Sequence, residues 1–331
     1  MNQSINLASR PSGKPEISNF KFELGTMPLA AEGEVVIKTL FVSVDPYMRG
    51  RMNNAESYIP PFELNQPIES GVIAEVISSA NDAFAVGDFV SGILNWKEYQ
   101  TSDGKGLIKV DANTAPLSAY LGVLGMTGLT AYLGLIKIGA PKAGETLVVS
   151  GAGGAVGSIV GQIGKILGCK VIGIVGTDDK AAILTNKYGF DAALNYRSDT
   201  DLRASIAHLC PDGVDIYFDN VGGEISDAVM HNLNRFARVP LCGAISLYNS
   251  IEAGTGPRFE LMMVLKSILV QGFIYHNFSD DIPEALTQLA AWLSEGKLSY
   301  TETIVEGFQN LPVAFIDLFE GRNEGKMVVR I

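Results

Sequence analysis

Cysteine and histidine are scarce in this chain, and neither occurs before Cys169. The cysteines are Cys169, Cys210 and Cys242, and the histidines are His208, His231 and His276. A zinc site needs clustered Cys, His and carboxylate ligands, so the first part of the chain cannot assemble a catalytic or a four-cysteine zinc. We therefore expect no metal. Three cysteines also provide no disulfide framework, which favours a reducing cytoplasm.

Basic residues are in the minority, with 25 Lys and Arg against 36 Asp and Glu and a net charge of -11. Such a surface repels a polyanion, so we expect no nucleic-acid partner. An anionic cofactor would have to be held by a few well-placed Lys or Arg residues.

No long uninterrupted apolar run is present. The most membrane-like window, residues 146–168, contains several glycines and Lys165. It divides into a β-rich run and a small-residue helix, which favours a buried βα unit over a membrane span. The polar amino terminus also lacks the apolar core of a secretory signal, so we expect no membrane partner.

The length of 331 residues favours two lobes. Residues 1–123 show short β-runs between turn residues, and residues 302–331 end in a β-run that we expect to complete this β-rich lobe. Residues 124–301 alternate β-runs with helices, which predicts an α/β fold with a doubly wound parallel sheet of the Rossmann type. Pro240 lies in the fifth of these β-runs, and we expect it at a strand start or facing away from a neighbour.

A glycine turn at Gly151–Gly157 lies between a β-run and a helix. In this order the free N–H groups at the helix start can face a pyrophosphate, with Ala152 in place of the first glycine of the usual pattern. Tight helix-on-strand packing would also require glycines. The βαβ context favours a dinucleotide.

The residues after the second β-run favour NADPH over NADH. An NAD enzyme usually has an acid there to bind the ribose 2′-hydroxyl, whereas this chain has Gly176 and Thr177, followed by Lys180. Asp178 and Asp179 argue mildly against a 2′-phosphate, although acids also suit the first turn of a helix. Lys180 could alternatively be a solvated surface lysine.

Several sequence blocks together resemble one family. They are VDPYMRGRM at 44–52, SYIPPF at 57–62, GMTGLTAYLGL at 125–135, the glycine turn, DNVGGE at 219–224, CGAISLYN at 242–249 and GRNEGK at 321–326. They resemble the zinc-independent leukotriene and prostaglandin reductase group of the medium-chain dehydrogenases, which includes alkenal double-bond reductases and bacterial curcumin-type reductases. Zinc-dependent relatives have a Gly-His-Glu motif where this chain has QPIESG at 66–71. Thr127 departs from the proline that this family commonly has.

The resemblance implies a GroES-like first lobe, a Rossmann second lobe and a homodimer formed through the second lobe. It also implies that NADPH lies with its 2′-phosphate on Lys180, its adenosine end near Tyr196 and its ribose or nicotinamide side near Asn220. The full set of expected cofactor residues is Ala152, Gly153, Gly154, Ala155, Val156, Gly157, Gly176, Thr177, Lys180, Tyr196, Asn220, Cys242, Gly243, Ala244, Ile245, Ser246, Tyr248, Phe273, Ile274, Tyr275 and Asn323.

Members of this group reduce the carbon–carbon double bond of α,β-unsaturated ketones or aldehydes, so the resemblance implies an enone or enal substrate. Hydride reaches the β-carbon, an enolate develops and a proton must reach the α-carbon. A tyrosine hydroxyl can stabilise the enolate, and we rank Tyr248 first, then Tyr58 and Tyr47. Each could instead only shape the pocket wall.

Other interpretations remain open. Cys242 could be a nucleophile but is expected to be structural. Arg49 and Arg51 could anchor a substrate carboxylate but are expected to form surface salt bridges. The alternative functions are an NADPH quinone oxidoreductase and a dinucleotide-binding sensor without catalysis.

Overall fold

The computed structural model describes residues 1–331, which form two units. The first unit contains residues 1–122, 302–323 and 327–331. The second contains residues 123–301 and 324–326. The chain therefore builds most of the second unit in one excursion from the first, and it contributes residues 324–326 to the second unit after it has returned.

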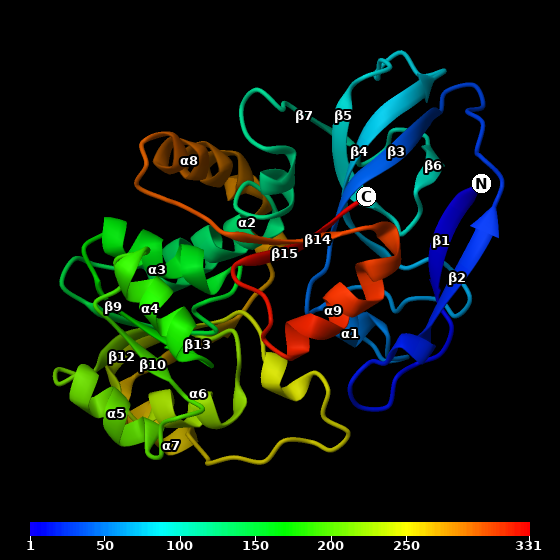
Figure 1. The fold of residues 1–331 in the computed structure, drawn as a ribbon. Helices are drawn as coiled ribbons and strands as arrows, with labels where there is room; N and C mark the ends of the chain where they lie inside the picture. Colours follow the sequence, from blue (N-terminus) through cyan, green and yellow to red (C-terminus); the bar gives the residue numbers. More distant parts are fainter. The chain divides into compact units, whose positions relative to one another are not determined.

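The first unit is rich in antiparallel strands (Figure 1). Its elements are β1 (Asn2–Leu7), β2 (Phe20–Gly25), β3 (Val35–Ser43), α1 (Met48–Arg51), β4 (Glu69–Ser79), β5 (Phe89–Asn95), β6 (Tyr99–Ser102), β7 (Ile108–Val110), β14 (Glu302–Glu306), α9 (Leu311–Phe319) and β15 (Lys326–Arg330). One sheet has the order β14-β15-β3-β4-β5-β7, with β6 also paired to β3, and β1 pairs with β2. The final β-run, β15, thus lies beside β3, as expected.

Alternating and fully buried positions explain this sheet. Val35 and Ile37 on β3 point into the same core as Val72 on β4, because side chains two residues apart share a face. Trp96 is fully buried in this core, and its indole N–H donates to Ser70 Oγ at 2.9 Å. The only polar group of the buried indole is therefore hydrogen-bonded.

The second unit is a parallel six-stranded sheet with helices (Figure 1). Its elements are α2 (Met126–Leu133), β8 (Thr146–Ser150), α3 (Gly157–Ile166), β9 (Lys170–Val175), α4 (Asp178–Asn186), β10 (Ala192–Asn195), α5 (Leu202–Leu209), β11 (Val214–Phe218), α6 (Gly223–Met230), β12 (Leu233–Leu241), α7 (Glu260–Lys266), β13 (Leu269–Gly272) and α8 (Ile282–Ser294). The strand order is β10-β9-β8-β11-β12-β13. This order confirms the doubly wound sheet. From β8 the chain first adds strands on one side, β9 and β10, and then on the other, from β11 onward, so the switch point lies between β8 and β11.

Residues 146–168 form the expected βα unit. Every residue of β8 is buried, as in a central parallel strand. Ile159, Val160 and Ile163 of α3 are buried, and the helix packs against β8 and β9. None of the helices combines the length and the apolar character needed to cross a membrane.

Pro240 does not start a strand, so the first of the two placements expected for it is wrong. Pro240 is the next-to-last residue of β12, which lies between β11 and β13. Its carbonyl accepts from the Asp219 N–H at 3.0 Å. Proline has no N–H to donate, but its carbonyl still forms a hydrogen bond to Asp219, so the end of β12 stays joined to the residue that follows β11.

Candidate active site

The glycine turn brings the end of β8 to the start of α3 without room for side chains. Gly151 has φ of +59°, which favours glycine. A Cβ on Gly157 would lie 2.7 Å from the Ala152 Cα and would overlap the Gly151 carbonyl. Both glycines are therefore required by the path of the backbone.

The start of α3 presents free backbone donors. Within unit 2, the N–H groups of Ala155, Val156 and Gly157 donate to no acceptor of the chain. Val156 at the N-cap makes no side-chain hydrogen bond to the helix. Such an end binds phosphate through its N–H groups and its dipole, which is where the sequence predicts the pyrophosphate.

The other turn residues have distinct places. Ala152 is fully buried, so its side chain packs inside the unit and cannot face a ligand. The Gly153 carbonyl accepts from the Gly325 N–H at 3.0 Å, and Gly154 forms a bridge with Gly325. The segment 324–326 therefore packs directly on the glycine turn.

The end of β9 carries a cluster of positive charge. Thr177 caps α4 by accepting from the Lys180 N–H at 3.3 Å, and the Lys180 side chain lies beside Gly153. A Cβ on Gly176 would lie 3.2 Å from the Tyr196 ring. Gly176, Thr177, Lys180 and Tyr196 are thus brought together, as the sequence predicts.

Arg197 also belongs to this cluster, although it was not among the predicted cofactor residues. Its Nε donates to Tyr196 Oη at 3.4 Å and would lie 3.3 Å from a Cβ on Gly176. Burial, followed by the positive charge of Arg197, lowers the pKa of Lys180. Two cations so placed repel each other, which suits a doubly charged phosphate. The signal was available, since Arg197 directly follows Tyr196.

A second cluster lies where β8 and β11 end. The Asp219 Oδ1 accepts from the hydroxyls of Ser150 and Tyr217, each at 2.8 Å. It also accepts from the N–H groups of Val221 and Gly222, at 2.9 and 3.0 Å. Asp219 is fully enclosed and was missed from the sequence because its neighbours come from two strands.

Asn220 is held by this cluster. Its N–H donates to Ser150 Oγ at 2.9 Å, and its side-chain amide donates to the Ser150 carbonyl at 2.8 Å. The side-chain oxygen of Asn220 accepts no hydrogen bond from either of these Ser150 groups. This places an amide at the switch point between β8 and β11, where a dinucleotide is expected.

Residues 242–248 follow β12 and turn back on themselves. The N–H groups of Cys242 and Gly243 donate to the Asp219 carbonyl at 2.8 and 3.1 Å. The Ser246 hydroxyl donates to the Val221 carbonyl at 2.6 Å, and the Ile245 N–H donates to the Asn220 carbonyl at 3.3 Å. The segment is therefore tied to the loop that follows β11.

Tyr248 points back onto this segment. Its hydroxyl oxygen accepts from the Ala244 N–H at 3.3 Å. A phenol has one donor and two acceptor positions, so this bond leaves the O–H able to donate. Burial raises the pKa of Tyr248, which keeps the phenol protonated around neutral pH. Burial also raises the pKa of the Cys242 thiol to about 12, which makes it a poor nucleophile.

The predicted segment 273–275 follows β13. The Phe273 ring packs edge-on to Phe218 with centroids 6.1 Å apart, so its side chain belongs to the core. The Tyr275 ring lies 3.9 Å from the His276 ring, and burial raises its pKa. Ile274 precedes Tyr275 in extended conformation. Asn323 ends the segment 302–323 of the first unit.

Two candidate tyrosines lie in the first unit. Tyr47 is the N-cap of α1 and packs against the core of that unit. Tyr58 lies in the loop between α1 and β4, with 64% of its surface exposed. These two hydroxyls and that of Tyr248 are therefore carried by different units.

The expected surface salt bridges of Arg49 and Arg51 are wrong in their location, because both side chains are buried. Arg49 donates to the carbonyls of Pro11 and Gly13. Arg51 pairs with Glu69 at 3.0 Å and lies over the Phe62 ring at 4.0 Å. Both arginines therefore support the loops of the first unit.

No group of three or more His, Cys, Asp or Glu side chains is arranged to hold a metal ion. Glu69 lies in QPIESG and pairs with Arg51. All three cysteines are unpaired.

Two family profiles match the chain. One, described as the N-terminal domain of oxidoreductase, matches residues 3–110. The other, described as zinc-binding dehydrogenase, matches residues 155–292.

Named relatives cover nearly the whole chain. An NADPH-dependent curcumin reductase of Escherichia coli is 43% identical over 98% of this chain and 95% of its own length. An NADP⁺-dependent 2-alkenal reductase of Nicotiana tabacum is 40% identical over 100% of this chain and 97% of its own. The crystal structure of CurA from Vibrio vulnificus in complex with NADPH is 44% identical, with a TM-score of 0.95 over 99% of this chain and 98% of that one.

Proposed function

Since this chain belongs to the zinc-independent reductase family of the medium-chain dehydrogenases, we propose that it uses NADPH to reduce the carbon–carbon double bond of enones and enals. The observation that carries this function is the likeness, over both units, to reductases named for curcumin and 2-alkenals. It is an NADPH-dependent oxidoreductase, and its substrate is a small molecule.

The residues of the second unit fit NADPH. The free N–H groups at residues 155–157 suit the pyrophosphate, and the absence of a Cβ at Gly157 leaves the turn close to α3. Lys180 and Arg197 supply two positive charges for the 2′-phosphate. The Asp178 carboxylate accepts from the Asn195 side-chain amide at 2.8 Å.

The chemistry divides between cofactor and protein. When bound, NADPH supplies the hydride that the β-carbon accepts. The protein must hold the carbonyl, stabilise the enolate oxygen and protonate the α-carbon. We assign the first-ranked donor role to Tyr248, because its hydroxyl keeps a free O–H and its raised pKa keeps it protonated. Tyr58 and Tyr47 remain the candidates from the first unit.

The reaction is tested with purified protein and NADPH deuterated at the transferred position. We expect NADPH consumption with alkenals, chain enones or cyclic enones, and a saturated carbonyl product with deuterium on the β-carbon. Consumption with quinones alone would contradict the proposal, as would an allylic alcohol product, because the double bond would then survive. Mass spectrometry and NMR of the product distinguish these results.

Replacing Tyr248 by Phe tests the donor. We expect kcat to fall by roughly ten- to a thousand-fold if the hydroxyl stabilises the enolate, while the Kd for NADPH stays unchanged. Because the Tyr248 pKa is raised above its ordinary value of 10.0, the wild-type rate should not decline below that pH through loss of this proton. Tyr47→Phe and Tyr58→Phe are the matched variants, and an unchanged kcat in Tyr248→Phe removes it from the mechanism.

We also propose a homodimer formed through the second unit. Support comes from β13, which has β12 on one side and an unpaired edge on the other. The neighbouring α7 exposes Leu261, Val264 and Leu265. An apolar surface beside a free strand edge suits a second copy of the chain, since a two-fold axis can pair identical edges.

We further propose that the protein resides in the cytoplasm. Three unpaired cysteines support this location, because a reducing compartment keeps thiols free. Fractionation of the native host with an antibody against the chain would test it.

A further inference from the structure

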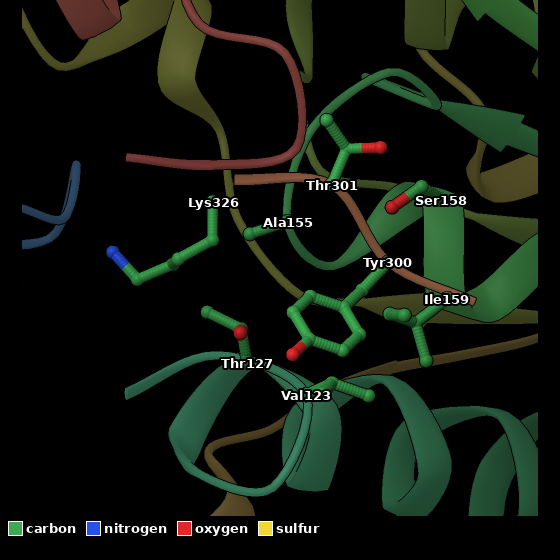
Figure 2. Close-up of a pocket in the computed structure, with 8 residues that line it drawn as sticks. All are labelled: Val123, Thr127, Ala155, Ser158, Ile159, Tyr300, Thr301 and Lys326. Carbon is green, nitrogen blue, oxygen red and sulfur yellow. The ribbon is translucent and has the colours of Figure 1, made fainter. Parts of the chain in front are cut away.

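A small cavity in the second unit lies next to the glycine turn (Figure 2). Its walls include Thr127 from α2, Ala155 and Ser158 from the start of α3, and Tyr300 and Lys326 from the returning chain. Its volume is about 10 Å³, which is room for about one water-sized group and far too little for an enone substrate. The cavity suits one small polar group.

Thr127 brings an unsatisfied hydroxyl to this cavity. The residue is only 5% exposed, and its Oγ1 has no hydrogen-bond partner in the chain. Figure 2 shows its side chain rising from α2 toward the space below Ala155. A buried hydroxyl without a partner costs roughly 1–3 kcal/mol.

The helix does not explain this hydroxyl. Gly125 is the N-cap of α2, so Thr127 is already inside the first turn, and no side chain caps this end. Proline, common here in the resembling family, would suit the same position, because first-turn N–H groups have no helical acceptor. The buried hydroxyl of Thr127 therefore does not stabilise α2 through a hydrogen bond.

The chemistry around the cavity favours an anion. Among the lining side chains, Lys326 carries a positive charge, and it is 4% exposed. The Tyr300 phenol is the other ionisable group, and it is only weakly acidic. The lining residue Ala155 carries one of the three free N–H groups of the α3 start. Ser158, 2% exposed, adds a second aliphatic hydroxyl. No Asp or Glu is among the residues that line the cavity.

We propose that the Thr127 hydroxyl donates to a phosphoryl oxygen of the dinucleotide pyrophosphate, and that this cavity is an additional phosphate contact of this chain. The inference rests on the proposed use of NADPH. It adds a residue from α2 to a site otherwise formed by the backbone of α3.

Binding measurements on the whole protein test the contact. The variants are Thr127→Val, which keeps the volume but removes the hydroxyl, and Thr127→Ser, which keeps the hydroxyl. The probes are NADPH, followed by fluorescence, and adenosine 2′-monophosphate, which carries the 2′-phosphate but no pyrophosphate. We expect Thr127→Val to raise the Kd for NADPH by about tenfold, the effect of one hydrogen bond to a charged group. Its Kd for adenosine 2′-monophosphate should not change.

Thr127→Ser should bind both probes within about twofold of the wild type. In the absence of ligand, Thr127→Val should melt no lower than the wild type, because the lost hydroxyl had no partner. The proposal is overturned by wild-type NADPH affinity in Thr127→Val, by equal loss in Thr127→Ser, by loss toward both probes, or by a lower melting temperature of the free variant. Failure of the proposed function appears differently, as wild-type protein that does not bind NADPH or does not reduce enones.

Discussion

Lys180 and Arg197 form the charged end of the cofactor site through contacts that sequence spacing only half predicts. Lys180 follows the capping Thr177 by three residues, which places it over the turn, beside Gly153. Arg197 reaches the same place from the end of β10 because β10 and β9 are neighbours in the sheet. Burial, and after it the positive charge of Arg197, lowers the pKa of Lys180. Bound phosphate would relieve this repulsion.

We expect Lys180→Ala and Arg197→Ala each to raise the Kd for NADPH by about tenfold, since each removes a charge-assisted contact. The Kd for NADH should change little, because NADH has no 2′-phosphate. Titration of both nucleotides at two salt concentrations measures this, and the NADPH affinity of the variants should depend less on salt. Arg203→Ala, an exposed arginine of α5, is the matched control. Equal losses for NADPH and NADH would contradict a 2′-phosphate contact.

At this scale the sequence predicts residues whose partners are local. Thr177 caps α4 within its own helix, so its place follows from spacing alone. Asp219 collects donors from Ser150, 69 residues earlier, and the unsatisfied hydroxyl of Thr127 becomes visible only when its surroundings are known. Neither the contacts of Asp219 nor the surroundings of Thr127 could be predicted from the sequence, because both depend on where side chains point after folding.

Elements of the second unit follow from their sequence more closely than single contacts do. β8 is continuously buried, and α3 follows a turn rich in glycine, so both were predicted with their order. β12 was less predictable because it begins at Leu233, ahead of the ARVPL run at 237–241, and its register with β11 shifts. Phe236, with φ of +64°, lies within this irregular stretch. A local periodicity rule does not anticipate such a shift.

The ends of β8 and β11 depend on one carboxylate, which gives a test of their connection. In Asp219→Ala four donors lose their acceptor, and we expect unit 2 to lose roughly 3 kcal/mol of stability, or about 6–12 °C in Tm. NADPH affinity should fall as well, because Asn220 and residues 242–248 are tied to Asp219. Differential scanning fluorimetry and NADPH titration measure the two effects.

Tyr217→Phe is the control, since it removes one of these donors but leaves the carboxylate. It should cost about 1 kcal/mol. If Asp219→Ala melts no lower than Tyr217→Phe, the carboxylate does not organise these strand ends.

For the molecule as a whole, the exposed edge of β13 is the feature most in need of a partner. A free edge offers a row of backbone donors and acceptors to another strand, and proteins usually cover or charge such edges. Here Leu269 and Val270 of β13 are exposed, and the adjacent α7 exposes Leu261, Val264 and Leu265, at 70–76%. Neighbouring apolar side chains on a monomer surface indicate an interface.

Light scattering after gel filtration should therefore give about twice the 35.4 kDa chain mass for the wild type. Leu265→Glu combined with Val264→Glu places two like charges in each copy of the interface, so we expect dissociation to monomers at micromolar concentration. Val86→Glu, at an exposed apolar residue of the first unit, should leave the mass unchanged. A monomeric wild type at every concentration, or dissociation by the control as well, would contradict the dimer. A wild-type monomer would expose the apolar side chains of α7 to water, whereas the double variant carries two glutamates there. The variant monomer should therefore be more soluble than wild-type monomer obtained by dilution below the dimer Kd.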